Sequence, residues 1–271
     1  MDKLGRSSRI AIITKILMDN PNKIIKLNEF SDMLNAAKST ISEDILIIRE
    51  SLSELEMGRI ETISGVLGGI RFIPMLSRAK AKEFALDLCE LLRDKNRVIT
   101  GDFMYMTDII YNPLIIKKAG LILASSFKEK KIDYVITVET KGIPLAYEVA
   151  RNLGVQLVIA RRENQVTEGS TVTINYVSAT SGQLQQMSLS KKAMNPNCNS
   201  IFIDDFMKGG GTALGIEELV KEFNCTLVGI GVMVDKVDIN KKLIDEYVSI
   251  VEIMSVDKTS SIDVQPYKKI F

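Results

Sequence analysis

The chain has 271 residues, with 35 lysines and arginines against 34 aspartates and glutamates, so its formal net charge is +1. This length leaves room for one large or two ordinary domains, and the near-neutral total argues against nucleic-acid binding. The sequence contains no histidine, which excludes the Ser-His-Asp and Cys-His arrangements and removes the usual general base. Hydrophobic residues make up 46% of the chain, as expected for a globular protein with a full core.

Three cysteines, Cys89, Cys198 and Cys225, are spread along the chain. Because their number is odd and none forms a Cys-x-x-Cys pair, we expect buried thiols of a reducing compartment, with no disulfide framework and no zinc site. The N-terminus lacks the apolar segment of a signal peptide, and no apolar run reaches the roughly 18–20 residues that span a bilayer. These features predict a cytoplasmic protein.

The first 74 residues have the pattern of a winged helix-turn-helix. Apolar residues at helical spacing predict one helix that ends before Pro21, a second over residues 27–34, and a third with the apolar stripe Ile41, Ile45, Ile48, Leu52 and Leu55. Thr40 and Glu43 have the spacing of a capping box that opens this third helix. Residues 60–63 and 69–73 flank a glycine-rich turn and predict the hairpin wing.

Charge and polarity suggest which part of this domain faces DNA. Residues 1–40 hold seven basic against four acidic residues, whereas residues 41–74 hold three against six. Small polar side chains and Asp44 share the face of the third helix that a recognition helix presents to the major groove. The predicted DNA contacts are Arg6, Arg9, Lys38, Ser39, Thr40, Ser42, Arg49, Gly69 and Arg71. A helical interaction or dimerisation domain fits the same pattern, so this alternative stays open.

The sequence changes character near Pro74. Beyond it, helical segments alternate with β-branched runs, which predicts an α/β domain with a parallel sheet. These runs lie at residues 133–138, 155–160 and 200–204. A helix over residues 76–92, with Phe84 and Leu88 at helical spacing, is expected to bridge the two parts. The predicted domains are residues 1–74 and residues 75–271, with residues 75–95 as a linking helix.

The most specific motif, Ile201–Ala213, joins an apolar strand to a glycine-rich loop and a helix. Backbone amides of such a loop at a helix N-terminus cradle a phosphate, and the Thr212 hydroxyl can donate to it. The carboxylates of Asp204 and Asp205 would repel a phosphate but suit the 2′ and 3′ hydroxyls of a ribose. No Gly-Lys-Ser/Thr follows, so the loop is not a Walker A motif. The pattern resembles the binding signature of type I phosphoribosyltransferases.

A second loop, Thr140–Gly142, follows the strand predicted over residues 134–138. In the phosphoribosyltransferase resemblance this loop binds diphosphate through backbone amides, with Lys141 adding charge. Both loops would lie at the carboxyl ends of parallel strands, where open α/β sheets bind ligands. Glu139 departs from the pattern, because it places a negative charge where a small residue is expected beside an anion site.

Residues 161–170 precede two alternating segments, 171–177 and 185–189, which predict a hairpin with a flexible loop. This hairpin resembles the arm that closes over the diphosphate in the same fold. Arg161 or Arg162 could reach the ligand anion from the preceding strand, and surface solvation is the alternative for each. Tyr105 and Phe206 are aromatic candidates for stacking on a base, with core or lid roles as the alternatives.

Joined to a winged helix, this fold resembles the purine operon repressor family of Gram-positive bacteria over nearly the whole chain. The residues that carry the resemblance are Lys38–Asp44, Thr137–Ala146, Val166–Ser178 and Asp204–Thr212. The resemblance implies a homodimeric repressor of purine biosynthesis genes that binds operator DNA and senses 5-phosphoribosyl 1-diphosphate (PRPP) as inducer. It also implies purine alarmones such as ppGpp as competing ligands, and it leaves open whether Mg²⁺ accompanies PRPP.

Carried onto this sequence, the resemblance places the ribose on the paired carboxylates, the 5′-phosphate on the glycine loop and the diphosphate on the second loop. The implied PRPP-binding residues are Asp204, Asp205, Phe206, Met207, Lys208, Gly209, Gly210, Gly211, Thr212, Ala213, Thr140, Lys141, Gly142, Arg161 and Tyr105. No catalytic residue, metal site or resident cofactor is expected, since Lys208 precedes a Gly-Gly-Gly-Thr loop where transferases commonly have Thr-Gly-Gly-Thr. An active purine phosphoribosyltransferase with an appended regulatory domain is the alternative.

Overall fold

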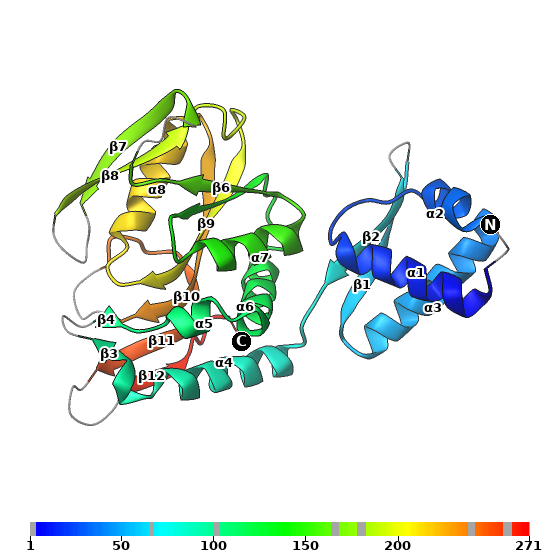
Figure 1. The fold of residues 1–271 in the computed structure, drawn as a ribbon, viewed down its shortest axis with the longest axis horizontal. Helices are drawn as coiled ribbons and strands as arrows, with labels where there is room; N and C mark the ends of the chain where they lie inside the picture. Colours follow the sequence, from blue (N-terminus) through cyan, green and yellow to red (C-terminus); the bar gives the residue numbers. More distant parts are fainter. Residues whose placement is uncertain are drawn as a thin grey trace. The chain divides into compact units, whose positions relative to one another are not determined.

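The structure is a computed structural model, and it describes residues 4–65, 68–99, 103–163, 168–177, 183–237, 242–256 and 262–270. Its internal contacts divide the chain into two compact units (Figure 1). The first unit comprises Met1–Ser77 with Asn152–Gly154, and the second comprises Arg78–Arg151 with Val155–Phe271. Each unit has a hydrophobic core of its own. Within the described ranges, no helix is long and apolar enough to cross a bilayer.

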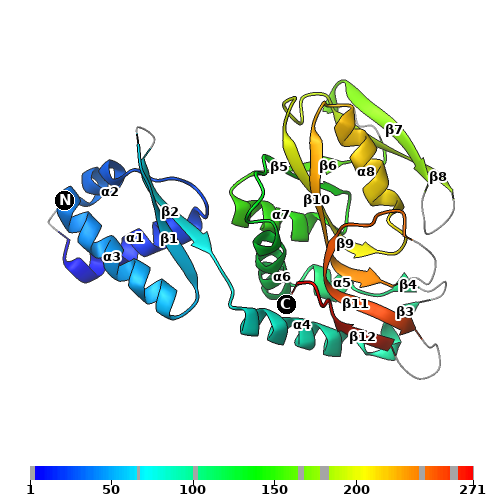
Figure 2. The ribbon, with the colours of Figure 1, turned by 180° about the vertical axis from the view of Figure 1, so that it is seen from behind.

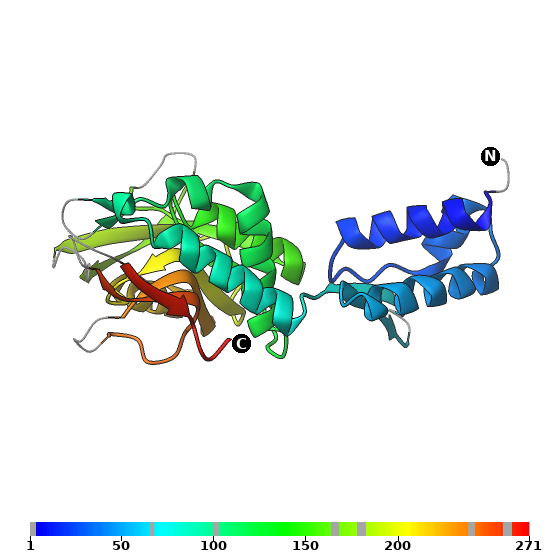
Figure 3. The ribbon, with the colours of Figure 1, turned by 90° about the horizontal axis from the view of Figure 1, so that it is seen from below.

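The first unit is a winged helix-turn-helix, as predicted. Its elements are α1 (Arg6–Asp19), α2 (Leu27–Leu34), α3 (Lys38–Glu54) and the antiparallel strands β1 (Gly58–Ile63) and β2 (Gly69–Pro74). Helices α1 and α3 lie side by side (Figure 3). The predicted apolar stripes form the core, since Ile13, Leu17, Phe30 and Ile41 are fully buried. At the end of the stripe on α3, Leu55 is 60% exposed.

The capping box predicted at Thr40 is wrong. Helix α3 begins at Lys38 with Ala37 as its N-cap, and no side chain caps it. Thr40 is therefore already inside the first turn, where its side chain cannot serve as the N-cap. The helix begins three positions earlier than the Thr40–Glu43 spacing suggested, since its N-cap is Ala37 and not Thr40.

The second unit contains a six-stranded sheet in the order β12-β11-β10-β9-β5-β6. The strands are β5 (Tyr134–Val138), β6 (Gln156–Ala160), β9 (Asn199–Met207), β10 (Thr226–Lys236), β11 (Val248–Val256) and β12 (Ile262–Pro266). The first five run parallel, and β12 is antiparallel to β11. The predicted parallel α/β domain is confirmed. Its β-branched runs form β5, β6 and β9, of which β6 lies at the edge of the sheet.

Helices cover both faces of this sheet. They are α4 (Arg78–Leu92), α5 (Thr107–Ile110), α6 (Pro113–Ser126), α7 (Ile143–Leu153) and α8 (Gly211–Lys221), and a short 3-10 helix, η1 (Lys95–Arg97), leads into the two-stranded sheet β3 (Val98–Ile99) and β4 (Phe103–Met104). Helix α4 packs on β11 and β12, so the predicted linking helix belongs to the second unit. Helix α7 connects β5 to β6, and α8 connects β9 to β10, so the two connections run toward opposite edges of the sheet. Because such connections are right-handed, the two helices lie on opposite faces.

Strands β7 (Thr171–Val177) and β8 (Leu184–Ser190) form the predicted antiparallel hairpin. It packs on α8 (Figure 2), where a Cβ added to Gly215 would lie 3.0 Å from both Tyr176 and Met187. Residues 164–167 and 178–182, which include most of the predicted flexible loop, lie outside the described residues.

The cysteine prediction is wrong for two of the three residues. Cys198 and Cys225 form a disulfide, with Cα atoms 4.7 Å apart. They lie next to the first residues of β9 and β10, so strand pairing brings together two cysteines that are 27 positions apart in the chain. That proximity is set by the sheet and leaves no signal in cysteine spacing. Cys89 is free and buried, and burial raises the pKa of its thiol to about 11.

Candidate functional site

The two predicted ligand loops meet at the carboxyl ends of the neighbouring strands β5 and β9. From these strands the chain continues to β6 on one side and to β10 on the other, so the site lies at the switch point of the sheet. Gly142 marks the contact between the loops, because a Cβ placed there would lie 2.5 Å from Asp204 Oδ1 and closer still to Thr137 Oγ1. Only a residue without a side chain allows this approach.

Asp204 and Asp205 follow the buried residues 200–203 of β9, and both aspartates are partly buried. The backbone N–H of Asp205 donates to Asp204 Oδ1 at 3.0 Å. Burial raises the pKa of Asp204 well above its ordinary value, and the adjacent charge of Asp205 raises it further, against the opposing charge of Arg162. Burial also raises the pKa of Asp205, against the opposing charge of Lys141. Lys141 and Arg162 therefore provide positive charge around the carboxylate pair.

The phosphate loop, Lys208–Gly210, connects β9 to the N-terminus of α8. Gly210 is the N-cap of that helix and has a φ of +81°, a left-handed conformation that favours glycine. Gly210 has no side chain to cap the helix, and no other side chain of the described residues hydrogen-bonds to its first N–H groups. These N–H groups and the positive end of the helix dipole are therefore suited to an anion. The loop borders a pocket of about 70 Å³, lined by Phe202, Asp204, Phe206, Met207, Lys208, Gly209, Gly210, Gly211, Thr212, Ala213 and Val232.

The surroundings of the loop Thr140–Gly142, which the resemblance assigns to diphosphate, explain the unexpected Glu139. The Glu139–Thr140 peptide is cis, and the N–H of Glu139 donates to Ala160 O at 3.1 Å. The Glu139 carboxylate accepts from Arg161 Nη1 at 3.1 Å and from the backbone N–H of Arg162 at 2.9 Å. Its negative charge is thus balanced by Arg161 and held by the end of β6, so it does not stand unpaired beside the anion site.

Arg161 and Arg162 have different surroundings. Arg161 also donates from Nε to Glu168 Oε1 at 2.8 Å, and its hydrogen bonds to Glu168 and Glu139 raise its pKa. Its charge is therefore matched by two carboxylates. The side chain of Arg162 is exposed, and its charge acts on Asp204. Within the described ranges, Arg161 forms ion pairs with carboxylates and Arg162 does not, so Arg162 is the better candidate to meet a ligand anion.

The two aromatic candidates, Phe206 and Tyr105, have different surroundings in the structure. Phe206 lines the phosphate-loop pocket. Tyr105 follows β4, is 46% exposed and donates its N–H to Arg97 O at 2.7 Å. Among the described residues, no hydrogen bond joins Tyr105 to either ligand loop.

One further contact of the phosphate loop is not predicted from the sequence. Lys242 Nζ donates to Lys208 O at 3.2 Å, although no motif includes this lysine.

The candidate DNA interface needs one correction at Arg9. Its side chain is only 9% exposed and pairs with Asp44, with Nε to Oδ2 at 2.7 Å and Nη2 to Oδ1 at 3.3 Å. Asp44 is fully buried, because it lies on the face of α3 that carries Ile41, Ile45 and Ile48. Arg9 and Asp44 therefore hold α1 to α3 inside the domain, and neither is placed to contact DNA.

Other residues of the predicted interface remain at the surface. Lys38, Ser39 and Ser42 are exposed at the start of α3, Thr40 is partly exposed, and the side chain of Arg6 is 57% exposed beside Asp44. The serine Oγ at Ser42 donates to Lys38 O at 2.9 Å.

The wing residues of the predicted interface have structural partners. Arg71 pairs with Glu61 at 2.6 Å and lowers the pKa of that carboxyl, and Arg49 donates to Thr62 Oγ1 at 2.8 Å. Gly69 permits a close approach of two backbone segments, since an added Cβ would lie 2.5 Å from Ile25 O. All three residues therefore shape the wing.

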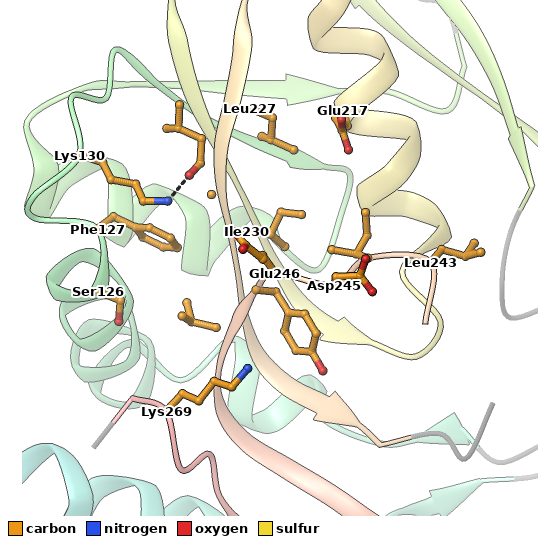
Figure 4. A pocket seen from close by; sticks show the side chains of 15 residues that line it. Ser126, Phe127, Lys130, Glu217, Leu227, Ile230, Leu243, Asp245, Glu246 and Lys269 are labelled. Carbon is orange, nitrogen blue, oxygen red and sulfur yellow. Dashed lines mark hydrogen bonds between the residues drawn. The ribbon is translucent and has the colours of Figure 1, made fainter. Parts of the chain in front are cut away.

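A larger pocket, of about 630 Å³, lies near the amino-terminal half of β10 (Figure 4). It exists because β11 pairs with β10 only from Gly231 onward, which leaves residues 227–230 without a strand on that side. Lys130 extends along this pocket and donates to the backbone carbonyl of Val228. Its other charged side chains are of both signs, with Lys269 on one side and Glu217 and Asp245 across from it. None of the predicted site residues lines this pocket.

Comparisons with known sequences cover both units. The family described as bacterial purine repressor, N-terminal, matches residues 5–74, and the phosphoribosyl transferase domain family matches residues 106–267. The chain is 43% identical over 264 residues to the purine biosynthesis transcriptional repressor PurR of Bacillus subtilis, which covers 97% of this chain and 93% of that protein. It is 41% identical over 263 residues to the purine biosynthesis transcriptional activator PurR of Lactococcus lactis, with 97% of each chain covered.

Enzymes resemble the second unit alone. Xanthine phosphoribosyltransferase of Bacillus mycoides is 31% identical over 179 residues, which cover 63% of this chain and 91% of the enzyme. Adenine phosphoribosyltransferase of Rhodothermus marinus superposes with a TM-score of 0.52 at 18% identity, covering 63% of this chain and 99% of the enzyme, which confirms the predicted fold. Since the similarity to the purine regulators extends over nearly the whole chain and includes the winged helix, this protein belongs to the bacterial purine repressor family.

Proposed function

We propose that this protein is a DNA-binding transcriptional repressor of purine biosynthesis genes and that PRPP is its inducer. The observation that carries the proposal is the contact at Gly142, where a diphosphate-type loop and a ribose-phosphate motif meet in a chain that also has a winged helix. One relative is named a repressor and another an activator. The proposal commits to repression that PRPP relieves by weakening DNA binding.

In the proposed complex, the ribose hydroxyls donate to Asp204 and Asp205. The 5′-phosphate accepts from the N–H groups of the phosphate loop and the start of α8, and the diphosphate occupies the loop Thr140–Gly142. Lys141 and Arg162 supply positive charge on the diphosphate side, which supports this orientation. A group of three His, Cys, Asp or Glu side chains able to hold a metal is absent from the described residues. If Mg²⁺ accompanies PRPP, we expect it on the phosphate oxygens of the ligand, as is usual for this ion at phosphate sites.

Purine nucleotides that carry diphosphate groups, such as ppGpp, would compete for the same loops and so favour repression. Operator DNA would contact the start of α3, where Lys38 and Ser42 are exposed, together with Arg6. A homodimer would present this small basic surface twice, in keeping with the symmetry habits of repressors.

An active purine phosphoribosyltransferase is the second candidate, and the 31% identity to a xanthine phosphoribosyltransferase is the observation in its favour. We propose binding without turnover, because Lys208 precedes a Gly-Gly-Gly-Thr loop where transferases commonly have Thr-Gly-Gly-Thr. Tyr267, which follows β12, is 7% exposed, stacks on Tyr247 with ring centroids 6.0 Å apart, and donates to Tyr247 O at 3.2 Å, so its ring is engaged in core contacts. Steady release of inorganic diphosphate from PRPP and a purine base would contradict this part of the proposal.

The deciding experiment is a gel-shift assay with promoter DNA of a purine biosynthesis operon, in the presence and absence of PRPP. The double variant Asp204→Asn/Asp205→Asn should bind DNA like the wild type but ignore PRPP, because it can no longer accept two ribose hydrogen bonds as carboxylates. The matched control is Asp245→Asn/Asp263→Asn, which changes two exposed aspartates outside both loops and should respond normally. A wild-type protein that never binds the DNA, or binds it equally with PRPP, would overturn the mechanism.

A further inference from the structure

We propose that Lys242 is a positioning residue for the phosphate loop, and that it sets the geometry of the 5′-phosphate subsite without touching the ligand. The proposal rests on the proposed binding of PRPP at this site. Lys242 lies in the connection from β10 to β11, 34 positions after Lys208 in the chain. No sequence motif includes it, and its role follows from its contacts.

The three N–H donors of the Lys242 ammonium are matched by three acceptors. Nζ donates to the carbonyl of Lys208 at 3.2 Å, to the carbonyl of Lys236 at 3.1 Å and to the carboxylate of Asp235. Because an ammonium has three donors and no acceptor, none remains for a ligand. Lys242 therefore acts by joining the end of β10 to the phosphate loop.

The ion pair between Lys242 and Asp235 is buried, which restricts the position of the ammonium. Asp235 is fully buried, and the side chain of Lys242 is 12% exposed. The second carboxylate oxygen of Asp235 accepts from the Tyr247 hydroxyl at 2.9 Å, and the ammonium lies 5.1 Å from the centre of the Tyr247 ring. A buried carboxylate that lost its cation would be strongly disfavoured, so the folded protein holds Lys242 in place.

The two residues after Lys242 continue the contact in register with the loop. The N–H of Leu243 donates to the carbonyl of Gly209 at 3.0 Å. The side chain of Ile244 packs against Gly210, where an added Cβ would lie 3.2 Å from Ile244 Cγ1. Residues 242–244 thus contact residues 208–210 one by one.

This register orients the loop for an anion. In a trans peptide the N–H and the C=O point in opposite directions. Since the carbonyls of Lys208 and Gly209 are held by residues 242 and 243, the N–H groups that follow them, on Gly209 and Gly210, are directed away from that segment. Removal of the Lys242 ammonium would free the first of these peptides to rotate and would spoil the arrangement of donors.

Loss of the Lys242 contact should affect binding of the 5′-phosphate and not binding of the diphosphate. Among the described residues, no hydrogen bond or ion pair joins residues 242–244 to the diphosphate loop Thr140–Gly142. Loss of the tether should therefore weaken binding of a sugar phosphate and spare binding of inorganic diphosphate. A general loss of folding would weaken both.

The test measures binding of ribose 5-phosphate, inorganic diphosphate and PRPP to the full-length protein by isothermal titration calorimetry. Lys242→Met should weaken ribose 5-phosphate and PRPP by about tenfold or more, which is the effect of one hydrogen bond to a charged group, and should leave diphosphate within about twofold. Lys130→Met is the matched control. It also removes a lysine that donates to a backbone carbonyl of β10, at Val228, and should change none of the three affinities.

The double variant Asp235→Asn/Lys242→Met guards against misfolding, because it leaves no buried charge unpaired while still lacking the tether. It should show the same selective loss. Equal losses for sugar phosphate and diphosphate, or no loss in either variant, would overturn the proposal. A wild-type protein that binds none of the three compounds would refute the proposed PRPP site itself, and with it the role of Lys242, before any variant is compared.

Discussion

Asp204 and Asp205 lie side by side where burial disfavours their charged forms. In the unfolded chain both carboxyls titrate near the ordinary value of 3.8, and the folded protein raises the pKa of each. The folded state therefore holds these protons more tightly than the unfolded state. For these two groups, the free energy of unfolding is highest below the ordinary value and falls as the pH rises through the raised values.

Asp204→Asn should remove part of this fall in the free energy of unfolding with rising pH. We expect the variant to gain stability relative to the wild type as the pH is raised from about 4 to 8, because an amide is not penalised by deprotonation at the buried position. Urea unfolding at several pH values measures the difference between the two proteins, so other titrating groups cancel. The exposed Asp263→Asn is the control and should show no such trend. A pH-independent difference for Asp204→Asn would contradict the raised pKa.

The pair Arg9–Asp44 leads to a second prediction. Asp44→Ala leaves a buried guanidinium without its carboxylate and should lower the free energy of unfolding of the first unit by about 3–5 kcal/mol. Glu43→Ala, at the exposed neighbour on α3, should change it by less than about 0.5 kcal/mol. Thermal unfolding followed by circular dichroism measures both. Equal effects of the two variants would show that the buried pair has no structural role.

The placement of site residues could be predicted where a motif or a resemblance points to it, and not where burial decides it. The loop at residues 204–212 is predicted from residue types and the loop at residues 140–142 from the resemblance, and the structure brings the two loops together at Gly142. The sequence predicts Arg9 at the surface because arginines are seldom buried unless they are paired, and its partner Asp44 is 35 positions away. Lys242 is not predictable from the sequence because its contact with the loop is made to the backbone carbonyl of Lys208, 34 positions away, and no motif includes it.

At the scale of elements, the wing depends on a close backbone contact. Ile25 and Ile70 form an isolated antiparallel bridge, and Gly69 lies against the Ile25 backbone beside it. Gly69→Ala would place a methyl group 2.5 Å from Ile25 O, and backbone atoms cannot rotate away as a side chain can. The wing would have to shift, which should lower the free energy of unfolding of the first unit by about 1–3 kcal/mol.

Gly5→Ala is the control for this substitution, because an added Cβ at Gly5 meets no atom within 4 Å. Its cost should stay below about 1 kcal/mol, because alanine is only a somewhat poorer residue than glycine at a helix N-cap. Urea unfolding compares the two variants. A Gly69→Ala protein of wild-type stability that no longer bound DNA would instead support the DNA contact predicted from the sequence.

Elements with a strong hydrophobic period were predictable, and their ends were less so. The stripes of α1 and α3 and the runs of β5, β6 and β9 became buried elements because their period matches the geometry of helix or strand. The start of α3 was misplaced at Thr40, since a capping motif is only one of the local forces at a helix end. The Cys198–Cys225 pairing depends on the order of strands in the sheet, which spacing alone does not encode.

At the scale of the molecule, the balance of 35 basic against 34 acidic residues hides much local pairing. In the first unit, Arg9 is matched by Asp44, and Arg59 and Arg71 by Glu61. The cations left for a phosphate backbone are therefore fewer than the sequence suggests. Among the described residues predicted to contact DNA, Lys38 is exposed, and the side chain of Arg6 is 57% exposed although its Nε lies 3.5 Å from Asp44 Oδ1. A repressor with so small a basic surface on each chain would depend on two chains binding together to reach useful affinity.

Because each unit has its own core, heating should give two unfolding transitions. Each transition can be assigned to a unit by the ligand that raises its temperature. A ligand that binds one folded unit stabilises it by about 2.7 kcal/mol at a hundred times its dissociation constant. PRPP should therefore shift the transition of the larger unit upward and leave the other in place, and operator DNA should shift the smaller one. Differential scanning calorimetry of the full-length protein measures both. If PRPP and DNA each shifted the same single transition, the two units would unfold together and their ligand sites could not be separated by stability.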